Sequence, residues 1–335
     1  MLAPSLSWVE AKQLLSIFWP PKPTFVPTEY PDLTGKVVIV TGGNTGVGYQ
    51  TAKLMSGVCN AKVYILSRNE AKTKLAIDNI QMEIKREQNK DVNLRFIKLD
   101  LGDLPTVKQT ANDFLKEEDR LDIIIHNAGV MTPPMGSKTA QGYDLQWGTN
   151  VLGPFLLQKL LDPIFIETSK KNPTNLSRVV WASSTAHLSA PDKGGIYWDD
   201  VNFQDPSKKY ANGEIYGQSK AGVIMNAIQW SKRYSNENIV SVSLCPGGLK
   251  TDLQRHLPGF VRSVLNLLLY DAVFGAYTEM FAAVSPEVTA ENNNHRMIIS
   301  FGRFGIIRKD IEEGANGENG EKYWNYAEKE VSKYL

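Results

Sequence analysis

A tyrosine and a lysine, Tyr216 and Lys220, are four residues apart at the start of a stretch with helical character that continues to Tyr234. This separation places both side chains on one face of a helix. An ammonium near a phenol favours the phenolate and lowers its pKa from the ordinary value of about 10. Such a phenol can exchange a proton with an alcohol or carbonyl oxygen. Taken alone, the pair could equally be a surface tyrosine and a surface lysine.

Two further candidate segments directly follow apolar runs of the chain. The run 179–182 ends in Ser183 and Ser184, and a serine at such a strand end can donate a hydrogen bond to a substrate oxygen and orient it. Ser183 could instead only satisfy the end of its strand. The run 239–244 leads into Cys245, Pro246 and Gly247, and proline followed by glycine after a strand predicts a turn.

A glycine-rich segment separates the first apolar run, 36–40, from a predicted helix at 51–58. Glycines in it permit a tight turn and let the backbone approach a pyrophosphate, while the helix presents free N–H groups to the anion. The segment therefore predicts a dinucleotide site, although a glycine cluster can also be only a turn. Its candidate binding residues are Gly42, Asn44, Thr45, Gly46, Val47 and Gly48.

The end of the second apolar run bears on which nicotinamide nucleotide is bound. An NAD enzyme generally has an acidic residue there to bind the ribose, but this chain has Ser67, Arg68 and Asn69. The planar guanidinium of Arg68 suits a 2′-phosphate. We therefore predict NADP(H) in preference to NAD(H). The alternative is that Arg68 is a solvated loop cation.

Strand and helix patterns alternate along the chain. Short apolar runs occur at 36–40, 61–66, 94–99, 123–125, 179–182 and 239–244, and helical stretches at 51–58 and 70–88. Buried parallel strands separated by helices give this pattern. It predicts an α/β fold: a doubly wound, Rossmann-like parallel sheet in a single domain, with an apolar lobe that covers the substrate and an extra N-terminal helical segment.

Composition narrows the functional classes. In 335 residues, hydrophobic side chains make up 42% and charged side chains 22%, which is typical of a folded globular chain. Lys and Arg number 37 against 36 Asp and Glu, so no nucleic-acid partner is expected. Two cysteines, Cys59 and Cys245, cannot form a disulfide framework and favour a reducing, cytoplasmic location. The four histidines have no metal-ligand spacing, so no metal is predicted.

The ends of the chain differ from its centre, and we divide it at 1–30, 31–311 and 312–335. Ser7 is a candidate cap for an amphipathic N-terminal helix, which either packs on the domain or contacts a membrane or lipid droplet through its Trp and Phe side chains. The apolar stretch 265–284 contains Asp271 and Glu279 and is interpreted as cover over a pocket. The glycine-rich segment after Gly314 is predicted to be a loop before a short surface helix in 323–335.

The glycine spacing GxxxGxG, together with the YxxxK pair, resembles the short-chain dehydrogenase/reductase family, over roughly 32–300. The resemblance implies an Asn-Ser-Tyr-Lys tetrad here of Asn150, Ser184, Tyr216 and Lys220, with Asn150 in a helix kink that holds a water beside Lys220. The family's second serine is the catalytic one, which selects Ser184. The resemblance also implies cofactor contacts from Asp100, Leu101, Asn127, Ala128, Gly129, Tyr216, Lys220, Pro246, Gly247 and, at the carboxamide, Thr251.

Two features set the chain within that family. His126 stands where family members more often have asparagine, but Asn127 to Gly129 are intact. The long interval between Ser184 and Tyr216, with its Tyr197-Trp198-Asp199-Asp200 segment, resembles the retinol-dehydrogenase-like and WW-domain-oxidoreductase-like branch, and 300–310 resembles fungal members of it. Family members often pair through the helices that carry Asn150 and Tyr216, which implies a homodimer through 143–167 and 215–234.

The expected activity is therefore NADP(H)-dependent interconversion of a carbonyl compound and its alcohol, with Tyr216 as general acid and base. Apolar candidates for the pocket wall, in 187–210 and 253–270, favour lipophilic or aromatic substrates; they are Trp198, Phe203, Leu257, Phe260, Leu265 and Leu269. The alternative is a nucleotide-binding protein of a membrane surface, or a scaffold, without essential catalysis; the N-terminal segment motivates it.

Overall fold

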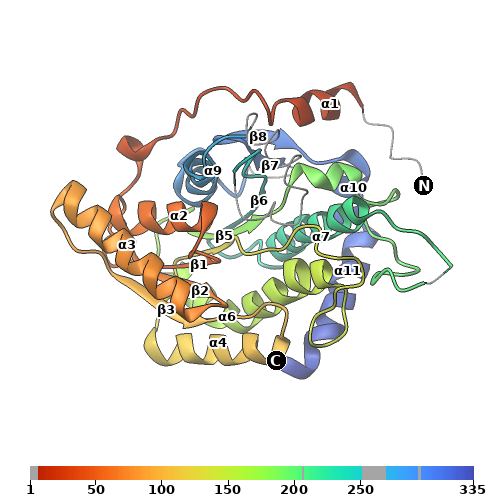
Figure 1. Cartoon of the computed structure of the whole chain (residues 1–335), viewed down its shortest axis with the longest axis horizontal. Helices are drawn as coiled ribbons and strands as arrows, with labels where there is room; N and C mark the ends of the chain where they lie inside the picture. Colours follow the sequence, from red (N-terminus) through yellow and green to blue (C-terminus); the bar gives the residue numbers. More distant parts are fainter. Residues whose placement is uncertain (1–6, 206, 251–268, 293–295) are drawn as a thin grey trace.

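The computed structural model describes residues 7–205, 207–250, 269–292 and 296–335 (Figure 1). Within them lies one eight-stranded sheet in the order β3-β2-β1-β4-β5-β6-β7-β8, parallel except for β8, which pairs antiparallel to β7. This order, with the chain reversing direction across the sheet after β3, is that of a doubly wound α/β fold. The strands are β1 Val37–Thr41, β2 Lys62–Ser67, β3 Leu94–Lys98, β4 Ile123–His126, β5 Ser177–Ala182, β6 Ile239–Leu244, β7 Arg296–Ile299 and β8 Arg303–Ile306.

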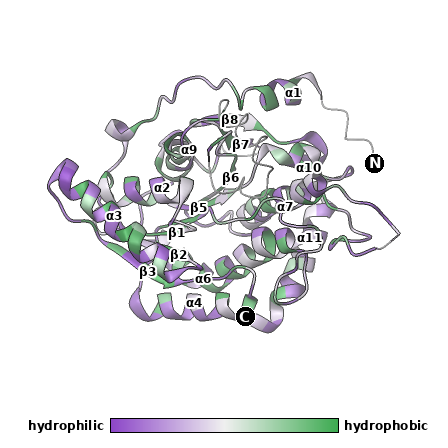
Figure 2. Ribbon diagram, viewed as in Figure 1, coloured by the Kyte–Doolittle hydropathy of each residue, from purple (hydrophilic) through white to green (hydrophobic). Residues whose placement is uncertain are grey.

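Helices cover both faces of the sheet, as the uninterrupted apolar strands predicted. Successive side chains of β1 alternate between the two faces: Val38 and Val40 join one buried cluster, Val37 and Ile39 the other. The helices are α1 Trp8–Leu15, α2 Gly46–Gly57, α3 Glu70–Gln88, α4 Leu104–Glu117, α5 Leu145–Trp147, α6 Gly153–Ser169, α7 Asn212–Arg233, α9 Ala272–Val284, α10 Lys309–Asn316 and α11 Glu318–Val331. Hydrophilic colour is prominent on α3 and α4, at the periphery (Figure 2).

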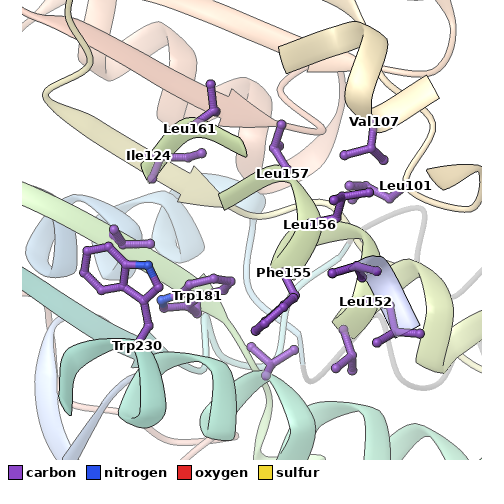
Figure 3. Close-up of a cluster of buried hydrophobic side chains, with 14 of the residues drawn as sticks. Leu101, Val107, Ile124, Leu152, Phe155, Leu156, Leu157, Leu161, Trp181 and Trp230 are labelled. Atoms are coloured by element: carbon purple, nitrogen blue, oxygen red, sulfur yellow. The ribbon is translucent and has the colours of Figure 1, made fainter. Parts of the chain in front are cut away.

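One face of the sheet is packed by α4, α6 and α7. Figure 3 shows the centre of this cluster, where Leu156 of α6 lies beside Leu101, and Trp230 of α7 lies near Trp181 of β5. The opposite face is packed by α2 and α9. The interpretation of 265–284 as pocket cover is wrong for α9, because its residues from Gly275 to Val284 are mostly buried against α2 and the sheet. No helix among the described residues is long and apolar enough to cross a bilayer.

The C-terminal region corrects a second expectation. The segment after Gly314 is not a loop: α10 continues to Asn316, and α11 begins at Glu318. Four side chains of α11, Tyr323, Trp324, Ala327 and Val331, have helical spacing and are buried in the same cluster as α6 and α7. Polar residues between them conceal this narrow stripe in the sequence.

Helix α11 also occupies the face through which pairing of two copies was expected. Trp324 packs edge-on against Phe155 of α6, at 4.9 Å between ring centroids, and lies under the guanidinium of Arg233 of α7. The Tyr323 hydroxyl donates to Asn226 Oδ1 of α7 at 2.6 Å. A second copy would have to displace these contacts, so the packing does not support a dimer through α6 and α7.

The N-terminal helix α1 packs on the domain, at the edge of the sheet. Ser7 caps it as predicted, with its side chain accepting from the backbone N–H of Glu10. The Gln13 side chain then pairs with the open edge of β8: its Nε2 donates to Ile306 O at 2.7 Å and its Oε1 accepts from Ile306 N at 2.8 Å. Two hydrogen bonds to one residue satisfy backbone groups that an edge strand leaves unpaired.

A buried carboxyl lies where α9 meets α2. Glu279 is fully buried; its Oε2 lies 2.5 Å from Thr51 Oγ1, and its Oε1 has no hydrogen-bond partner among the described residues. Burial raises the pKa of Glu279 from 4.5 to about 8. The carboxyl is therefore protonated and neutral in the folded protein at neutral pH, whereas an unfolded chain releases the proton.

This difference predicts a stability that falls with pH. Between pH 4.5 and about 8 the folded state binds the extra proton, so the free energy of unfolding decreases as pH rises through that window and levels off above it. Glu279→Gln keeps a hydrogen-bonding group but cannot ionise. We expect its melting temperature to match wild type near pH 5 and to exceed it by several °C near pH 8.5, measured by scanning calorimetry.

The exposed Glu287→Gln is the control, and it should follow wild type at both pH values. A Gln variant that melts below wild type by the same margin at both pH values would contradict a neutral buried carboxyl.

Candidate active site

The predicted site residues come together because parallel strands end at the same edge of a sheet. The segments that follow β1, β4, β5 and β6 therefore lie side by side at the carboxyl edge. They carry the glycine-rich turn, Asn127 to Gly129, the two serines, and Pro246 with Gly247. Helix α7 brings Tyr216 and Lys220 to this edge from the sheet face it covers.

The glycine-rich turn is shaped by backbone that side chains would block. Gly42 and Gly46 have φ of +69° and +57°, in the left-handed region that favours glycine. A Cβ on Gly48 would lie 2.5 Å from Asn127 Nδ2 and 2.6 Å from Gly42 O. Asn127 Nδ2 donates to Thr41 O at 2.8 Å, so the segment after β4 is tied to the start of the turn. Gly48 thus serves close packing.

A cavity of about 390 Å³ opens over this turn. It is lined by eleven of the predicted cofactor residues: Gly42, Asn44, Thr45, Gly46, Val47, Arg68, Asp100, Leu101, Asn127, Ala128 and Gly129. The sequence reasoning missed other lining residues, among them Ser67, Asn69, Lys72, Val130 and Thr149. Lys72 was detectable, because it lies four residues after Arg68, in the first turn of the predicted helix 70–88.

The cavity fits an anionic dinucleotide. The backbone N–H groups at the start of α2 face it, and two cationic side chains, Arg68 and Lys72, border it. Within the described residues, the Arg68 guanidinium and the Lys72 ammonium have no hydrogen-bond or ion-pair partner. The Asp100 carboxylate, by contrast, accepts from Gly102 N at 3.0 Å and so shapes the turn after β3.

Tyr216, Ser184 and Lys220 meet beside this cavity. The Ser184 side chain lies close enough to the Tyr216 hydroxyl to act on the pKa of the phenol, and Lys220 Nζ lies 5.6 Å from the centre of the Tyr216 ring. Lys220 Nζ donates to Ala182 O, at the end of β5, at 2.9 Å. Ser183 has a different environment, since its hydroxyl donates to the backbone carbonyl of Lys220 at 2.8 Å. Only Ser184 of the two serines therefore faces the phenol.

Asn150 lies in a π-helical turn, Gly148–Leu152, which is the kink that the family resemblance implied. Its side chain binds both backbone groups of Val130, accepting from N at 2.8 Å and donating to O at 3.0 Å, and it also donates to Ser219 Oγ at 3.0 Å. A Cβ on Gly129 would lie 3.0 Å from Asn150 Oδ1 and 3.6 Å from Lys220 Nζ. The absent side chain of Gly129 thus leaves a space bordered by both residues.

The electrostatics of the protein alone differ from the expectation that Lys220 acidifies Tyr216. Burial raises the pKa of Tyr216 above its ordinary value, and the nearby Ser184 hydroxyl only partly opposes this. Burial lowers the pKa of Lys220 to about 8. Desolvation disfavours charge on both side chains and outweighs their mutual effect. The phenol is therefore protonated in the protein without its cofactor.

The turn after β6 has its predicted place, but part of the expected pocket lies elsewhere. Gly247 has a φ of +109°, and a Cβ on Gly248 would lie 2.8 Å from Ile17 and 3.1 Å from Leu269. Trp198 does not line a pocket with them, because its indole N–H binds Asn319 of α11. Phe203 packs against Tyr210. Thr251, Leu257, Phe260 and Leu265 lie outside the described residues.

The buried His126 explains the departure from the family's asparagine. Its ring stacks on Trp181, at 4.3 Å between ring centroids, and its Nε2 is 3.1 Å from Gln158 Oε1. Burial lowers the pKa of His126 to about 4, so the ring is neutral. This histidine is a packing residue beneath the site and leaves Asn127 in place.

The fold and the site define a nucleotide-binding oxidoreductase. A family model described as short chain dehydrogenase matches residues 36–197. A short-chain dehydrogenase/reductase of Armillaria gallica is 40% identical over 97% of this chain and 99% of its own. One of Phomopsis amygdali is 38% identical over 95% and 96%, and an uncharacterized oxidoreductase of Schizosaccharomyces pombe 38% over 86% and 83%. The chain belongs to the short-chain dehydrogenase/reductase family.

Solved structures agree on the fold. A complex of Pseudomonas aeruginosa RhlG with NADP superposes with a TM-score of 0.58 at 21% identity, over 78% of this chain and 94% of that one. Escherichia coli yciK superposes with a TM-score of 0.56 at 20% identity, over 77% and 93%. The family binds a nicotinamide cofactor and acts on small molecules.

Proposed function

We propose that the protein is an NADP(H)-dependent oxidoreductase of the carbonyl reductase or alcohol dehydrogenase type. It interconverts a ketone or aldehyde, of lipophilic or aromatic character, and the corresponding alcohol. The observation that carries this proposal is the meeting of Tyr216, Ser184 and Lys220 at the strand edge that also holds the nucleotide cavity. A phenol, a hydroxyl and an ammonium at that place can bind and protonate a carbonyl oxygen.

Each side chain has a distinct task in this mechanism. Ser184 donates a hydrogen bond to the substrate oxygen and fixes its position. Tyr216, protonated in the free protein, gives its phenol proton to that oxygen in reduction and takes it back in oxidation. A bound reduced nicotinamide supplies the hydride. Lys220 stabilises the phenolate that remains, because its ammonium lies over the same ring. If the protein works in the cytoplasm, where the NADP(H) pool is mostly in its reduced form, the net reaction that we propose is reduction of the carbonyl compound.

The preference for NADP(H) is supported by charge. The side chains of Arg68 and Lys72, which border the cavity beside β2, have no partner in the part of the chain that the structure describes, and the end of β2 has no carboxylate. NADP occupies the related Pseudomonas aeruginosa RhlG structure and one from Shigella flexneri. A lipophilic substrate is supported by apolar groups next to the turn after β6, where Ile17 and Leu269 approach Gly248.

Removing the phenol oxygen tests the proposed catalysis. Tyr216→Phe should lower kcat for carbonyl reduction by about 100-fold to 10,000-fold, the usual contribution of a general acid. The Kd for NADPH should stay within about twofold of wild type, because the cavity contacts remain. Turnover is followed by NADPH absorbance with aliphatic and aryl ketones, and cofactor binding by calorimetry.

Tyr334→Phe, near the C-terminal end of the chain and not among the residues that line the cavity, is the matched control and should behave as wild type. If Tyr216→Phe kept full turnover, the assignment of the acid would be wrong. If wild type bound NADPH but reduced no carbonyl, the proposed activity would be lost and the scaffold alternative favoured.

Arg68→Ala tests the cofactor preference. A charge-assisted hydrogen bond to phosphate contributes roughly 1.5–3 kcal/mol, so the Kd for NADPH should rise by about 10-fold to 100-fold. The Kd for NADH should change little, because it has no 2′-phosphate. Arg86→Ala, on the exposed surface of α3, is the control. An equal loss of affinity for both cofactors, or tighter binding of NADH by wild type, would refute the preference.

A peripheral contact with a lipid surface is a second proposal, and the outer side of the N-terminal segment favours it. While Gln13 holds α1 to β8, Trp8 is 80% exposed and Trp19 70%, and Val9 and Leu15 are also exposed. Tryptophan partitions to the interface between lipid and water. A docked enzyme or a nucleotide-binding scaffold would both use this surface.

Flotation with phosphatidylcholine vesicles tests the contact. Wild type should float with the vesicles, and Trp8→Ser with Trp19→Ser should remain in the dense fractions. The control carries Leu75→Ser and Met82→Ser on α3, where both apolar side chains are 60% exposed, and it should float as wild type does. Wild type that stays in the dense fractions would reject the proposal.

A further inference from the structure

A fully buried histidine lies one turn after Ser184, in the short 3-10 helix Thr185–Ser189. The Nδ1 atom of His187 is 2.7 Å from the carbonyl oxygen of Ser184. Its Nε2 accepts from the backbone N–H of Arg308 at 3.3 Å. Because a backbone N–H can only donate, Nε2 carries no proton. The proton is then on Nδ1, which donates to Ser184 O. Burial lowers the pKa of His187 to about 4, so this neutral tautomer persists at neutral pH.

Arg308, which supplies the N–H, holds the rest of the same loop. Arg308 is 4% exposed, and its guanidinium donates to three backbone carbonyls of the loop, Leu188 O, Ala190 O and Pro191 O, at 3.2, 2.6 and 2.6 Å. Asp310 accepts from the same guanidinium at 2.6 and 2.9 Å. Arg308, two residues after the end of β8, therefore fixes the loop, and Asp310 balances its charge.

The opposite side of the loop rests on the helix that carries Tyr216. Gly217 follows Tyr216 directly, and a Cβ on Gly217 would lie 2.7 Å from Ala186 O and 2.8 Å from Ala190 N. The loop and helix α7 are thus in backbone contact one residue away from the phenol. The distance between Ser184 and Tyr216 depends on how this loop is held.

We infer that His187 is a positioning residue for the reaction. Held by Arg308, it fixes the backbone of Ser184 and so aims the Ser184 hydroxyl at the Tyr216 oxygen. The Ser184 hydroxyl also accepts from Ala186 N at 3.1 Å, within the same short turn, so a rotation of that turn would move it. This inference rests on the proposed role of Ser184. His187 itself contacts neither substrate nor cofactor in this scheme and acts only through Ser184.

A double-mutant cycle tests it. His187→Phe keeps the ring volume and removes both polar contacts. We expect kcat to fall by about 10-fold to 100-fold while the Kd for NADPH stays unchanged, as for the loss of one well-aimed hydrogen bond. In a Ser184→Ala background the same substitution should cause no further loss, because the group it aims is absent. His187→Asn, which restores a donor to Ser184 O, should recover most of the lost kcat.

His126→Phe is the matched control, since His126 is an equally buried neutral histidine without a contact to Ser184. Its effect on kcat should be the same in both backgrounds. If His187→Phe lowered kcat equally with and without Ser184, or left kcat unchanged, the inference would be overturned, because His187 would then support only the fold.

A second readout separates this inference from the proposed activity. In protein labelled with 13C at the tyrosine Cζ, the Tyr216 signal at pH 7 reports how closely the Ser184 hydroxyl approaches the phenol, and Tyr216→Phe assigns it. Ser184→Ala and His187→Phe should shift it in the same direction, without a further shift in the double variant. A wild type without carbonyl turnover refutes the activity alone, whereas an unmoved signal in His187→Phe refutes the positioning role.

Discussion

Two reciprocal hydrogen bonds between β5 and α7 set the geometry of the site. Lys220 Nζ donates to Ala182 O, and the hydroxyl of the next residue, Ser183, donates to the backbone carbonyl of Lys220. Both bonds are buried, where an unpaired polar group is costly. They fix the helix lengthwise on the end of the strand. Tyr216, one turn earlier on α7, is thereby placed beside Ser184.

This arrangement removes Tyr216 and Lys220 from solvent, which disfavours charge on both side chains. The buried ammonium of Lys220 and the buried phenol of Tyr216 both resist charge in the protein alone, and their pKa values move toward the neutral forms. The side chains of the site are therefore already in position while the phenol of Tyr216 is still uncharged. A proton on the phenol before carbonyl reduction is what a general acid requires.

The two ends of the chain reinforce this centre from outside the sheet. Helix α11 seals the face formed by α6 and α7 with Tyr323 and Trp324. Helix α1 covers the edge of β8, from which Arg308 reaches the loop after Ser184. Both terminal helices thus pack against the elements that position the site.

Much of the site could be predicted because its signals are local. A glycine turn between a strand and a helix, serines at a strand end, and Tyr216 and Lys220 one helical turn apart each depend on a few neighbouring residues. Six strands of the sheet were predicted for the same reason, since strands buried on both faces are continuously apolar. The strands β7 and β8 were missed because each of these four-residue strands begins with an arginine, and β8 also contains Gly305.

Local patterns in the amino-acid sequence are enough to predict the doubly wound fold, the family, and which side chains could bind a nucleotide or move a proton. The packing of the whole chain was needed to show that α11 covers α6 and α7, and that Arg308 and His187 hold the loop after Ser184. The difference follows from distance along the chain. These contacts join residues that are far apart in sequence, and their burial, which sets each pKa, is a property of the packed molecule rather than of any local pattern.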